Sequence, residues 1–185
     1  MVIYAAEHPN ARTLSIPLLE LAAKQYWSLS SPLILNKGAH GKPFFQDYPH
    51  HHFNISHSGQ YILCALDNVP VGIDIQIIKP RRTAFLDHLC SPQERQWLRE
   101  RNDHPEAFAL LWSMKESICK YSGRGLTFPI SNIKIPLPHN REKDLTLDGV
   151  CYSLFHGADW YACVCSQHPW SGELIWCHNS FNQQK

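Results

Sequence analysis

A long amphipathic helix is predicted between about Pro105 and Gly123. Its apolar positions recur at alternating steps of four and three residues, which is typical of a helix with one side against a core. A second series, Trp112, Glu116 and Lys120, recurs every four residues and therefore lines a separate face. A carboxylate and an ammonium group thus share a face that core packing does not require. The apolar series is Ala107, Leu111, Met114, Ile118 and Tyr121.

An alternating pattern from Val71 to Ile78 predicts a β-strand upstream of this helix. Its apolar side chains face one way, whereas Asp74 and Gln76 face the other. A second strand-like run, residues 61–66, precedes it, and the turn-like segment between the two runs predicts a hairpin. An acidic strand position combined with a Glu/Lys helix suggests a divalent metal ion that handles a phosphate.

The rest of the chain predicts an α+β fold, in which helices pack on antiparallel sheets. A helix is expected from Leu14 to Trp27, and the capping box that starts at Ser91 and ends at Glu94 predicts another helix that runs to about Arg101. Short strands are expected beyond the long helix, at residues 132–135, 145–147, 151–155, 160–165 and 174–177.

Composition and charge argue against several classes of protein. A net charge of +1 over 185 residues does not suit a nucleic-acid-binding protein with a large basic face. The longest apolar run has the length of a strand and is too short to span a membrane. The first residues lack a basic segment and include Glu7 and Pro9, so no secretory signal is expected. Seven cysteines, most of them in apolar segments, indicate reduced thiols and a cytoplasmic protein.

Four short sequence blocks occur in an order that resembles one enzyme family. The blocks are Gly41-Lys42-Pro43, Asn54-x-Ser56-His57-Ser58, Gly72-Ile-Asp74-x-Gln76 and Trp112-x-x-Lys115-Glu116-x-x-x-Lys120. Any one of them would be weak evidence, but the four together resemble the 4′-phosphopantetheinyl transferases. The resemblance extends over about residues 42–125 and is greatest to the single-chain type that activates secondary-metabolite synthetases, including its compact holo-acyl-carrier-protein synthases.

The resemblance implies a fold, a reaction and partners. The fold would be one domain of two similar α+β lobes, about residues 1–82 and 83–185, related by a pseudo-twofold axis, so that a monomer would suffice. The reaction would transfer the 4′-phosphopantetheine group from coenzyme A to a serine of an acyl or peptidyl carrier protein and release adenosine 3′,5′-bisphosphate. Mg²⁺, with Mn²⁺ as the alternative, is expected to bridge the two phosphates.

The resemblance also assigns roles at the reacting end of the coenzyme. Asp74 and Glu116 are the expected metal ligands, and Lys120 is expected to reach the phosphates. Lys115 lies about 100° around the helix from Glu116, so it either reaches a phosphate edge or stays in solvent. Glu116 is the nominated proton acceptor, but a hydroxide held by the ion is the alternative, since a metal-bound carboxylate is a weaker base.

At the nucleotide end, the resemblance places Ser56 and His57 on the 3′-phosphate of the coenzyme, with Lys42 nearby. Gly59 follows closely and would permit a tight turn and a close approach by a phosphate. Without the flanking motif, a strand-end histidine bonded to backbone would be the better interpretation of His57. Arg12 is a further candidate for the nucleotide, although an isolated arginine near a helix is usually solvated.

Gln76 departs from the family pattern, which usually has a second acidic residue at this position. An amide oxygen can face a hard cation but brings no charge. One interpretation is that Gln76 holds a water molecule beside the ion and that Asp74 and Glu116 suffice as ligands. The other is that metal affinity falls and the protein has become a weak or inactive relative.

Other activities and a partner surface stay open at this point. A coenzyme A or nucleotide sensor that has lost transfer through Gln76 is one alternative function. A metal-dependent phosphohydrolase is another, but it would leave the first two blocks unexplained. The basic segment Lys79–Arg82 follows the Asp74 strand and is interpreted either as a charged connector or as a docking rim for an acidic carrier protein.

Overall fold

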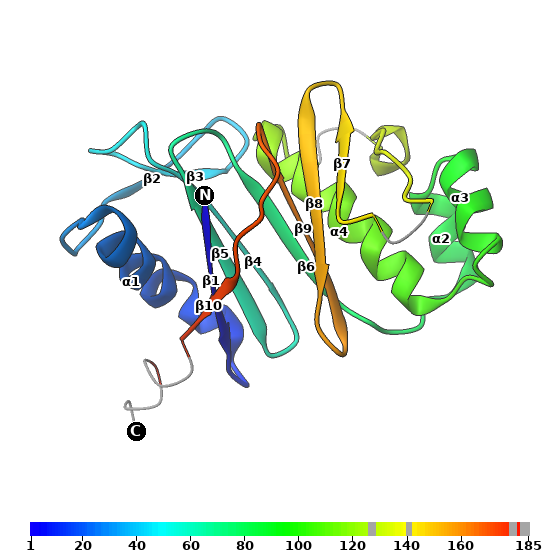
Figure 1. The fold of residues 1–185 in the computed structure, drawn as a ribbon, viewed down its shortest axis with the longest axis horizontal. Helices are drawn as coiled ribbons and strands as arrows, with labels where there is room; N and C mark the ends of the chain where they lie inside the picture. The colour runs from blue at the N-terminus through cyan, green and yellow to red at the C-terminus, as the bar shows by residue number, and fades with distance from the viewer. Residues whose placement is uncertain (126–128, 140–141, 178–180, 182–185) are drawn as a thin grey trace.

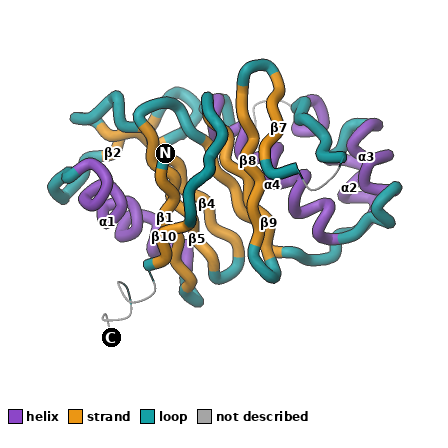
Figure 2. Tube along the Cα trace, in the orientation of Figure 1, coloured by secondary structure: helices purple, strands orange, loops and turns teal. Residues whose placement is uncertain are grey.

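The computed structural model describes residues 1–125, 129–139, 142–177 and 181. Two four-stranded sheets occupy the middle of the molecule, and helices lie on both outer sides of this pair (Figures 1 and 2). The expected α+β fold is therefore confirmed, while the pseudo-twofold relation between lobes stays a prediction.

The first sheet has the strand order β10-β1-β5-β4. Its central strands, β1 (Val2–Glu7) and β5 (Tyr61–Asp67), pair in antiparallel fashion. At one edge, β4 (His52–Ser58) is antiparallel to β5, and at the other edge β10 (Leu174–Trp176) is parallel to β1. The beginning and the end of the described chain thus lie side by side in one sheet (Figure 1).

Helix α1 (Ser15–Trp27) packs on one face of the first sheet, as the sequence predicts. It follows a short 3₁₀ helix, η1 (Ala11–Leu14). Two further strands, β2 (Leu35–Lys37) and β3 (Pro43–Phe45), form a small sheet of their own. The turn between them carries Lys42, which is the first of the expected site residues along this part of the chain.

The second sheet has the strand order β6-β9-β8-β7, and each neighbouring pair is antiparallel. The strands are β6 (Gly72–Ile77), β7 (Asp144–Leu147), β8 (Val150–His156) and β9 (Trp160–Ser166). All four agree with runs that the sequence predicts as strands. β6 is an edge strand, so the side of it that does not pair with β9 is available to other groups.

Helix α4 (Pro105–Ser122) is the predicted long helix, and it packs on β6 and β9. Two shorter helices, α2 (Thr83–Leu89) and α3 (Pro92–Arg99), lie at the outer end of the second sheet (Figure 1). The predicted capping box at the start of α3 is present in full. A 3₁₀ turn, η2 (Ile130–Asn132), follows α4 within the described residues.

Gly72 allows α4 to approach β6 as closely as it does. A Cβ atom at this position would lie 2.2 Å from both the Ser117 carbonyl oxygen and the Tyr121 backbone nitrogen. Both neighbours are backbone atoms of the helix, which cannot move aside as a side chain could. The glycine therefore sets the distance between Asp74 and the charged face of α4.

The two sheets enclose a core of their own between β1 and β5 on one side and β6 and β9 on the other. Val71, Ile73 and Ile75 are fully buried there, together with Ile3 and Leu63. The predicted alternation along β6 is thus confirmed: its apolar side chains enter this core, and Asp74 lies on the opposite face, toward α4.

Two predictions about the strands are wrong. Strands β5 and β6 do not form a hairpin, because β1 and β4 occupy both edges of β5 and β6 pairs instead with β9. Residues 132–135 are not a strand: Asn132 ends η2, and residues 133–135 have no paired neighbour in the described chain. Their strand-like pattern arises because Ile133 and Ile135 are both buried against the second sheet.

The expected lobe boundary near residue 82 does not coincide with the change of sheet. The chain leaves the first sheet after β5 and enters the second with β6, and β10 later returns to the first.

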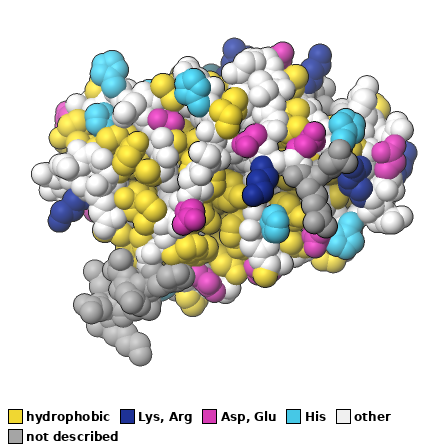
Figure 3. Space-filling view, viewed as in Figure 1, with side chains coloured by type: hydrophobic (Ala, Val, Ile, Leu, Met, Phe, Trp, Pro, Cys, Tyr) yellow, Lys and Arg dark blue, Asp and Glu magenta, His cyan; other side chains and the backbone are white. Residues whose placement is uncertain are grey.

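The front face in Figure 3 gathers hydrophobic side chains in its middle, where β10 and β8 lie, with charged side chains around them. Among the described residues, no helix combines the length and hydrophobicity that crossing a membrane requires.

Candidate active site

Asp74 and Lys120 form the centre of the candidate site. Asp74 is buried on β6, and the Lys120 ammonium nitrogen of α4 lies 2.6 Å from its Oδ1 atom. The same ammonium group also donates to the Ser56 hydroxyl at 3.0 Å and to the Ile73 carbonyl oxygen at 3.2 Å. All three hydrogen atoms of the ammonium group can thus be engaged. The predicted encounter of the acidic strand and the charged helix face is found.

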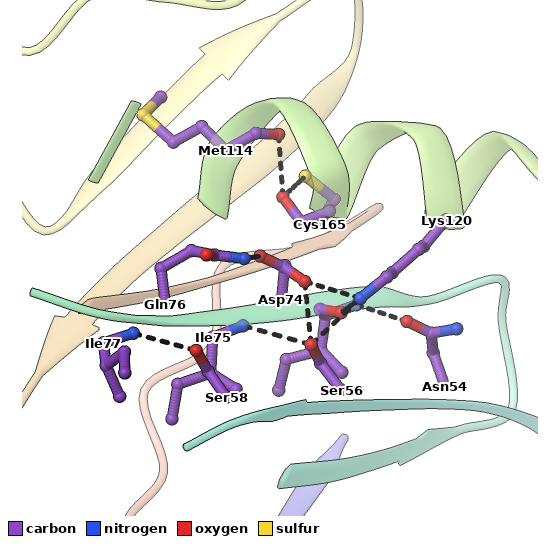
Figure 4. A network of polar contacts seen from close by, with 12 residues as sticks. Asn54, Ser56, Ser58, Asp74, Ile75, Gln76, Ile77, Met114, Lys120 and Cys165 are labelled. Carbon is purple, nitrogen blue, oxygen red and sulfur yellow. Dashed lines mark hydrogen bonds and ion pairs between the residues drawn. The ribbon is translucent and has the colours of Figure 1, made fainter. Parts of the chain in front are cut away.

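Two neutral side chains each donate a hydrogen bond to one oxygen of the Asp74 carboxylate. The Ser56 hydroxyl donates to Oδ1 at 2.7 Å, and the Gln76 amide nitrogen donates to Oδ2 at 2.7 Å. Figure 4 shows these groups converging between β4, β6 and α4. Hydrogen bonds to both oxygens, together with the Lys120 charge, compensate for the removal of the carboxylate from water.

Strand β4 joins the two sheets through its side chains. Its residues Asn54, Ser56 and Ser58 each accept a hydrogen bond from a backbone N–H group of β6, at distances of 2.8, 3.3 and 3.0 Å. The donors are the N–H groups of Ile73, Ile75 and Ile77 (Figure 4). We call these three contacts the β4–β6 seam. The free edge of β6 is thereby satisfied by side chains in place of another strand.

Glu116 lies one helical turn before Lys120 and is partly buried. Burial raises the pKa of its carboxyl group; the negative charge of Asp74 raises it further, and the Lys120 charge lowers it. The two carboxylates are therefore close enough to interact electrostatically across the same site. A carboxyl group with a raised pKa is a better proton acceptor than an ordinary surface glutamate.

A cavity of about 280 Å³ brings three of the four sequence blocks together. Lys42, Asn54, Glu116 and Lys120 all line it. Asp74 of the remaining block reaches the same place through its ion pair with Lys120. Residues separated widely in the sequence therefore converge on one concave site.

Lys42 lines this cavity and is partly buried. Its ammonium group donates to the Val71 carbonyl oxygen at 2.9 Å and to the Tyr121 carbonyl oxygen at 3.4 Å. Burial lowers the pKa of Lys42 to about 8. The contact with Tyr121 also satisfies a carbonyl group at the C-terminal end of α4, so Lys42 links the small sheet to that helix.

His57 and Arg12 lie on another side of β4. Successive residues of a strand point in opposite directions, so His57 faces away from the seam formed by its neighbours Ser56 and Ser58. Its imidazole is exposed, and its pKa is lowered by partial burial, then by the charge of Arg12 and then by that of Lys120. Arg12 therefore lies near His57, and the expected grouping of these residues on the 3′-phosphate stays a prediction.

Two expected coenzyme contacts are placed elsewhere. Lys115 reaches neither a phosphate edge nor solvent: it is 0% exposed and forms a 2.6 Å ion pair with Glu94, the acid of the α3 capping box. Its ammonium group also donates to the carbonyl oxygens of Leu89 and Ile130. Lys115 thus joins α2, α3 and η2 to α4. The Ser56 hydroxyl is likewise directed at Asp74, not at the surface that carries His57.

Sequence reasoning missed the seam residues Asn54 and Ser58 and the structural role of Glu94. A signal for the first pair exists, because polar residues alternate through the block 54–58 as they would on one face of a strand. The sequence indicates only a capping role for Glu94. Nothing in the sequence links it to Lys115, which lies on a different helix.

The fold and the site define an α+β protein with two interacting acids and two lysines around one cavity. Residues 70–172, more than half of the chain, match the family model described as the 4′-phosphopantetheinyl transferase superfamily. A 4′-phosphopantetheinyl transferase of Bacillus subtilis is 36% identical over 157 residues, which cover 80% of this chain and 69% of that protein.

Two further relatives are also named phosphopantetheinyl transferases. The 4′-phosphopantetheinyl transferase Sfp of Bacillus subtilis strain 168 is 33% identical over 154 residues, with 80% of this chain and 69% of that protein covered. The mouse L-aminoadipate-semialdehyde dehydrogenase-phosphopantetheinyl transferase is 31% identical over 144 residues, covering 62% of this chain and 45% of that protein. The chain belongs to the 4′-phosphopantetheinyl transferase superfamily. The predicted family and enzyme class are confirmed.

Proposed function

We propose that the protein transfers the 4′-phosphopantetheine group from coenzyme A to a serine of an acyl or peptidyl carrier protein. The observation that carries this proposal is the cavity in which Glu116, Lys120 and Lys42 meet beside Asp74. Its acids and cations have the chemistry that a pyrophosphate and an incoming alcohol require.

The residues present suit a hard divalent cation such as Mg²⁺, with Mn²⁺ as the alternative. Asp74 and Glu116 would hold the ion, and Gln76 would approach it through a water molecule. Among residues 1–125, 129–139, 142–177 and 181, no group of three or more His, Cys, Asp or Glu side chains forms a metal cage. Mg²⁺ is commonly bound by one or two carboxylates together with substrate phosphates, which is the ligand set proposed here. When bound, the ion offsets negative charge on the pyrophosphate.

Lys120 has the most direct part among the cations of the chain. Its ammonium group already lies in the cavity beside Asp74, where it can exchange its contact with the Ile73 carbonyl oxygen for a phosphate oxygen. It then stabilises the charge that develops on the leaving oxygen. Lys42, His57 and Arg12 would bind the nucleotide end, including the 3′-phosphate.

Glu116 is the proposed proton acceptor. The carrier serine oxygen forms a bond to the β-phosphorus of coenzyme A, and its proton passes to the Glu116 carboxylate. The bond between that phosphorus and the oxygen bridging to the α-phosphate breaks, and its electron pair leaves with adenosine 3′,5′-bisphosphate. A hydroxide supplied by the ion is the alternative acceptor, because a carboxylate that also binds the ion is a weaker base.

The segment Lys79–Arg82 is proposed to receive the carrier protein. The Arg81 guanidinium lies over the rings of Phe85 and Phe108, at 5.8 and 5.7 Å from their centroids. Phe108 in turn stacks on Trp112, one helical turn before Glu116. A fixed basic group connected to the active site in this way would favour an acidic partner and orient its serine.

One assay separates transfer from the two other candidate activities. The protein is incubated with coenzyme A, Mg²⁺ and an apo carrier protein, and the carrier is weighed intact by mass spectrometry. Covalent gain of phosphopantetheine supports the proposal. Coenzyme binding without that gain would indicate a sensor that has lost transfer through Gln76, and phosphate release with an unmodified carrier would indicate a hydrolase.

We also propose a cytoplasmic location and a monomeric state for the protein. All seven cysteines are free and buried, which suits a reducing, cytoplasmic environment. Both sheets and the whole candidate site come from one chain, so a monomer would be sufficient for activity.

A further inference from the structure

The three side chains of the β4–β6 seam make equivalent contacts with the backbone, but they differ in what else they touch. Asn54 and Ser58 each hold one N–H group of β6. Ser56 holds the N–H group of Ile75 and also contacts two charged groups of the active site. The seam therefore contains one residue whose position is tied to the chemistry.

The hydroxyl of Ser56 uses its full hydrogen-bonding capacity. It donates to Asp74 Oδ1 at 2.7 Å and accepts from the Lys120 ammonium group at 3.0 Å and from the Ile75 N–H group at 3.3 Å. A hydroxyl group has one hydrogen to donate and two lone pairs to accept with. The residue is also only 5% exposed, so water cannot readily replace these partners.

We propose that Ser56 is a positioning residue for phosphopantetheinyl transfer, a proposal that rests on the proposed function. Ser56 fixes one oxygen of the Asp74 carboxylate, and Gln76 fixes the other. The plane of the carboxylate is thereby set before any substrate arrives. The same hydroxyl aims the Lys120 ammonium group at the reacting end of the cavity, and the bond to β6 anchors it to the backbone.

This role differs from direct contact with the coenzyme. Ser56 points across the β4–β6 seam toward Asp74 and Lys120, whereas its neighbour His57 is exposed on the other side of β4. Loss of the hydroxyl should therefore reduce turnover more than coenzyme binding. Loss of a direct phosphate contact would instead weaken coenzyme binding more than it reduces turnover.

The chain offers a matched control at Ser58. Ser56→Ala and Ser58→Ala each remove one hydroxyl that accepts from a β6 N–H group, but only the first removes contacts with Asp74 and Lys120. For Ser56→Ala we expect kcat to fall at least tenfold, toward the roughly 100-fold cost of a misplaced reacting group. The KM for coenzyme A should change less than twofold. Ser58→Ala should keep kcat within about twofold of the wild type.

A thermal-unfolding cycle tests the contact without relying on activity. The melting temperature is compared for Ser56→Ala and Ser58→Ala, each in the wild type and in an Asp74→Ala background. Removal of the Ser56 hydroxyl should lower the melting temperature less when Asp74 is absent, because the two groups interact directly. Removal of the Ser58 hydroxyl should lower the melting temperature equally in both backgrounds.

The outcomes separate this inference from the proposed function. If the wild type does not modify a carrier protein, the proposed function fails, and with it the positioning role in transfer. If the wild type is active but Ser56→Ala behaves like Ser58→Ala in kcat, or raises only the coenzyme KM, the positioning role is overturned while the function stands. If Ser56→Ala lowers the melting temperature equally in the wild type and in the Asp74→Ala background, the inferred interaction between Ser56 and Asp74 is overturned.

Discussion

Asp74 and Lys120 are 46 positions apart in the sequence, and their side chains meet at 2.6 Å between β6 and α4. This ion pair is the point at which the two charged elements of the candidate site join. Asp74 is almost fully buried, whereas about a quarter of the Lys120 side chain is exposed. The lysine is therefore the partner that can turn toward a substrate while the aspartate stays in place.

Replacement of Lys120 by methionine should lower kcat/KM for carrier modification by about 100-fold, the usual cost of removing a group that stabilises developing charge. Lys24→Met, at an exposed position of α1, is the control and should leave the rate unchanged. The rates are measured by mass spectrometry of the carrier at several coenzyme concentrations. Equal rates for the two variants would remove Lys120 from the reaction.

Lys42 predicts how coenzyme binding depends on pH. Its pKa of about 8 means that the ammonium group loses its proton as the pH rises through that value. An anionic ligand favours the protonated form, so binding takes up a proton and affinity should fall between pH 7 and pH 9.5. Isothermal titration calorimetry with coenzyme A measures this fall. In Lys42→Met the affinity should be weaker at pH 7 and the decline above pH 8 smaller; an unchanged decline would exclude Lys42 as its source.

Lys115 predicts a stability effect that is separate from substrate binding. Lys115→Met leaves Glu94 buried without its cation, and loss of one partner of a buried pair costs about 3–5 kcal/mol. Urea unfolding should show this loss of free energy, and Lys115→Met combined with Glu94→Gln should lose less than the sum of the two single variants. The KM for coenzyme A should be nearly unchanged in whatever fraction is folded. Normal stability of Lys115→Met together with a raised KM for coenzyme A would instead support the expected contact of Lys115 with a phosphate.

Gln76 predicts how the site responds to an added negative charge. Gln76→Glu should tighten divalent-ion binding by at least about fivefold, since a further charge a few ångströms away is worth about 1–4 kcal/mol, while transfer is preserved. Titration with Mn²⁺ followed by electron paramagnetic resonance measures the affinity directly, and Gln96→Glu on the exposed face of α3 is the control. No change in metal affinity would mean that residue 76 is not near the ion.

The sequence predicted those parts of the site that depend on regular spacing within one element. The turn-by-turn spacing of Glu116 and Lys120, and the alternation that turns Asp74 away from the core, follow from helix and strand geometry alone. Long-range pairings could not be obtained in this way. The seam between β4 and β6 joins strands of different sheets, and only the folded chain shows that Ser56 lies beside Asp74.

The wrong predictions have the same origin. The segment after β5 has the composition of a hairpin turn, yet both edges of β5 are taken by strands from elsewhere in the chain. Lys115 was expected near phosphate or solvent because its position on α4 is next to Glu116. Its actual partner, Glu94, is brought there by the packing of α3 against α4.

The central claim is that Asp74 and Glu116 act together, with a divalent ion, on the pyrophosphate of coenzyme A. The most direct measurement is the intact mass of an apo carrier protein after incubation with coenzyme A, Mg²⁺ and either the wild type or the Asp74→Asn/Glu116→Gln double variant, whose folding is checked by circular dichroism. The wild type should add phosphopantetheine to the carrier, and the folded double variant should add none within the same time. Carrier modification at an undiminished rate by the double variant would contradict the claim.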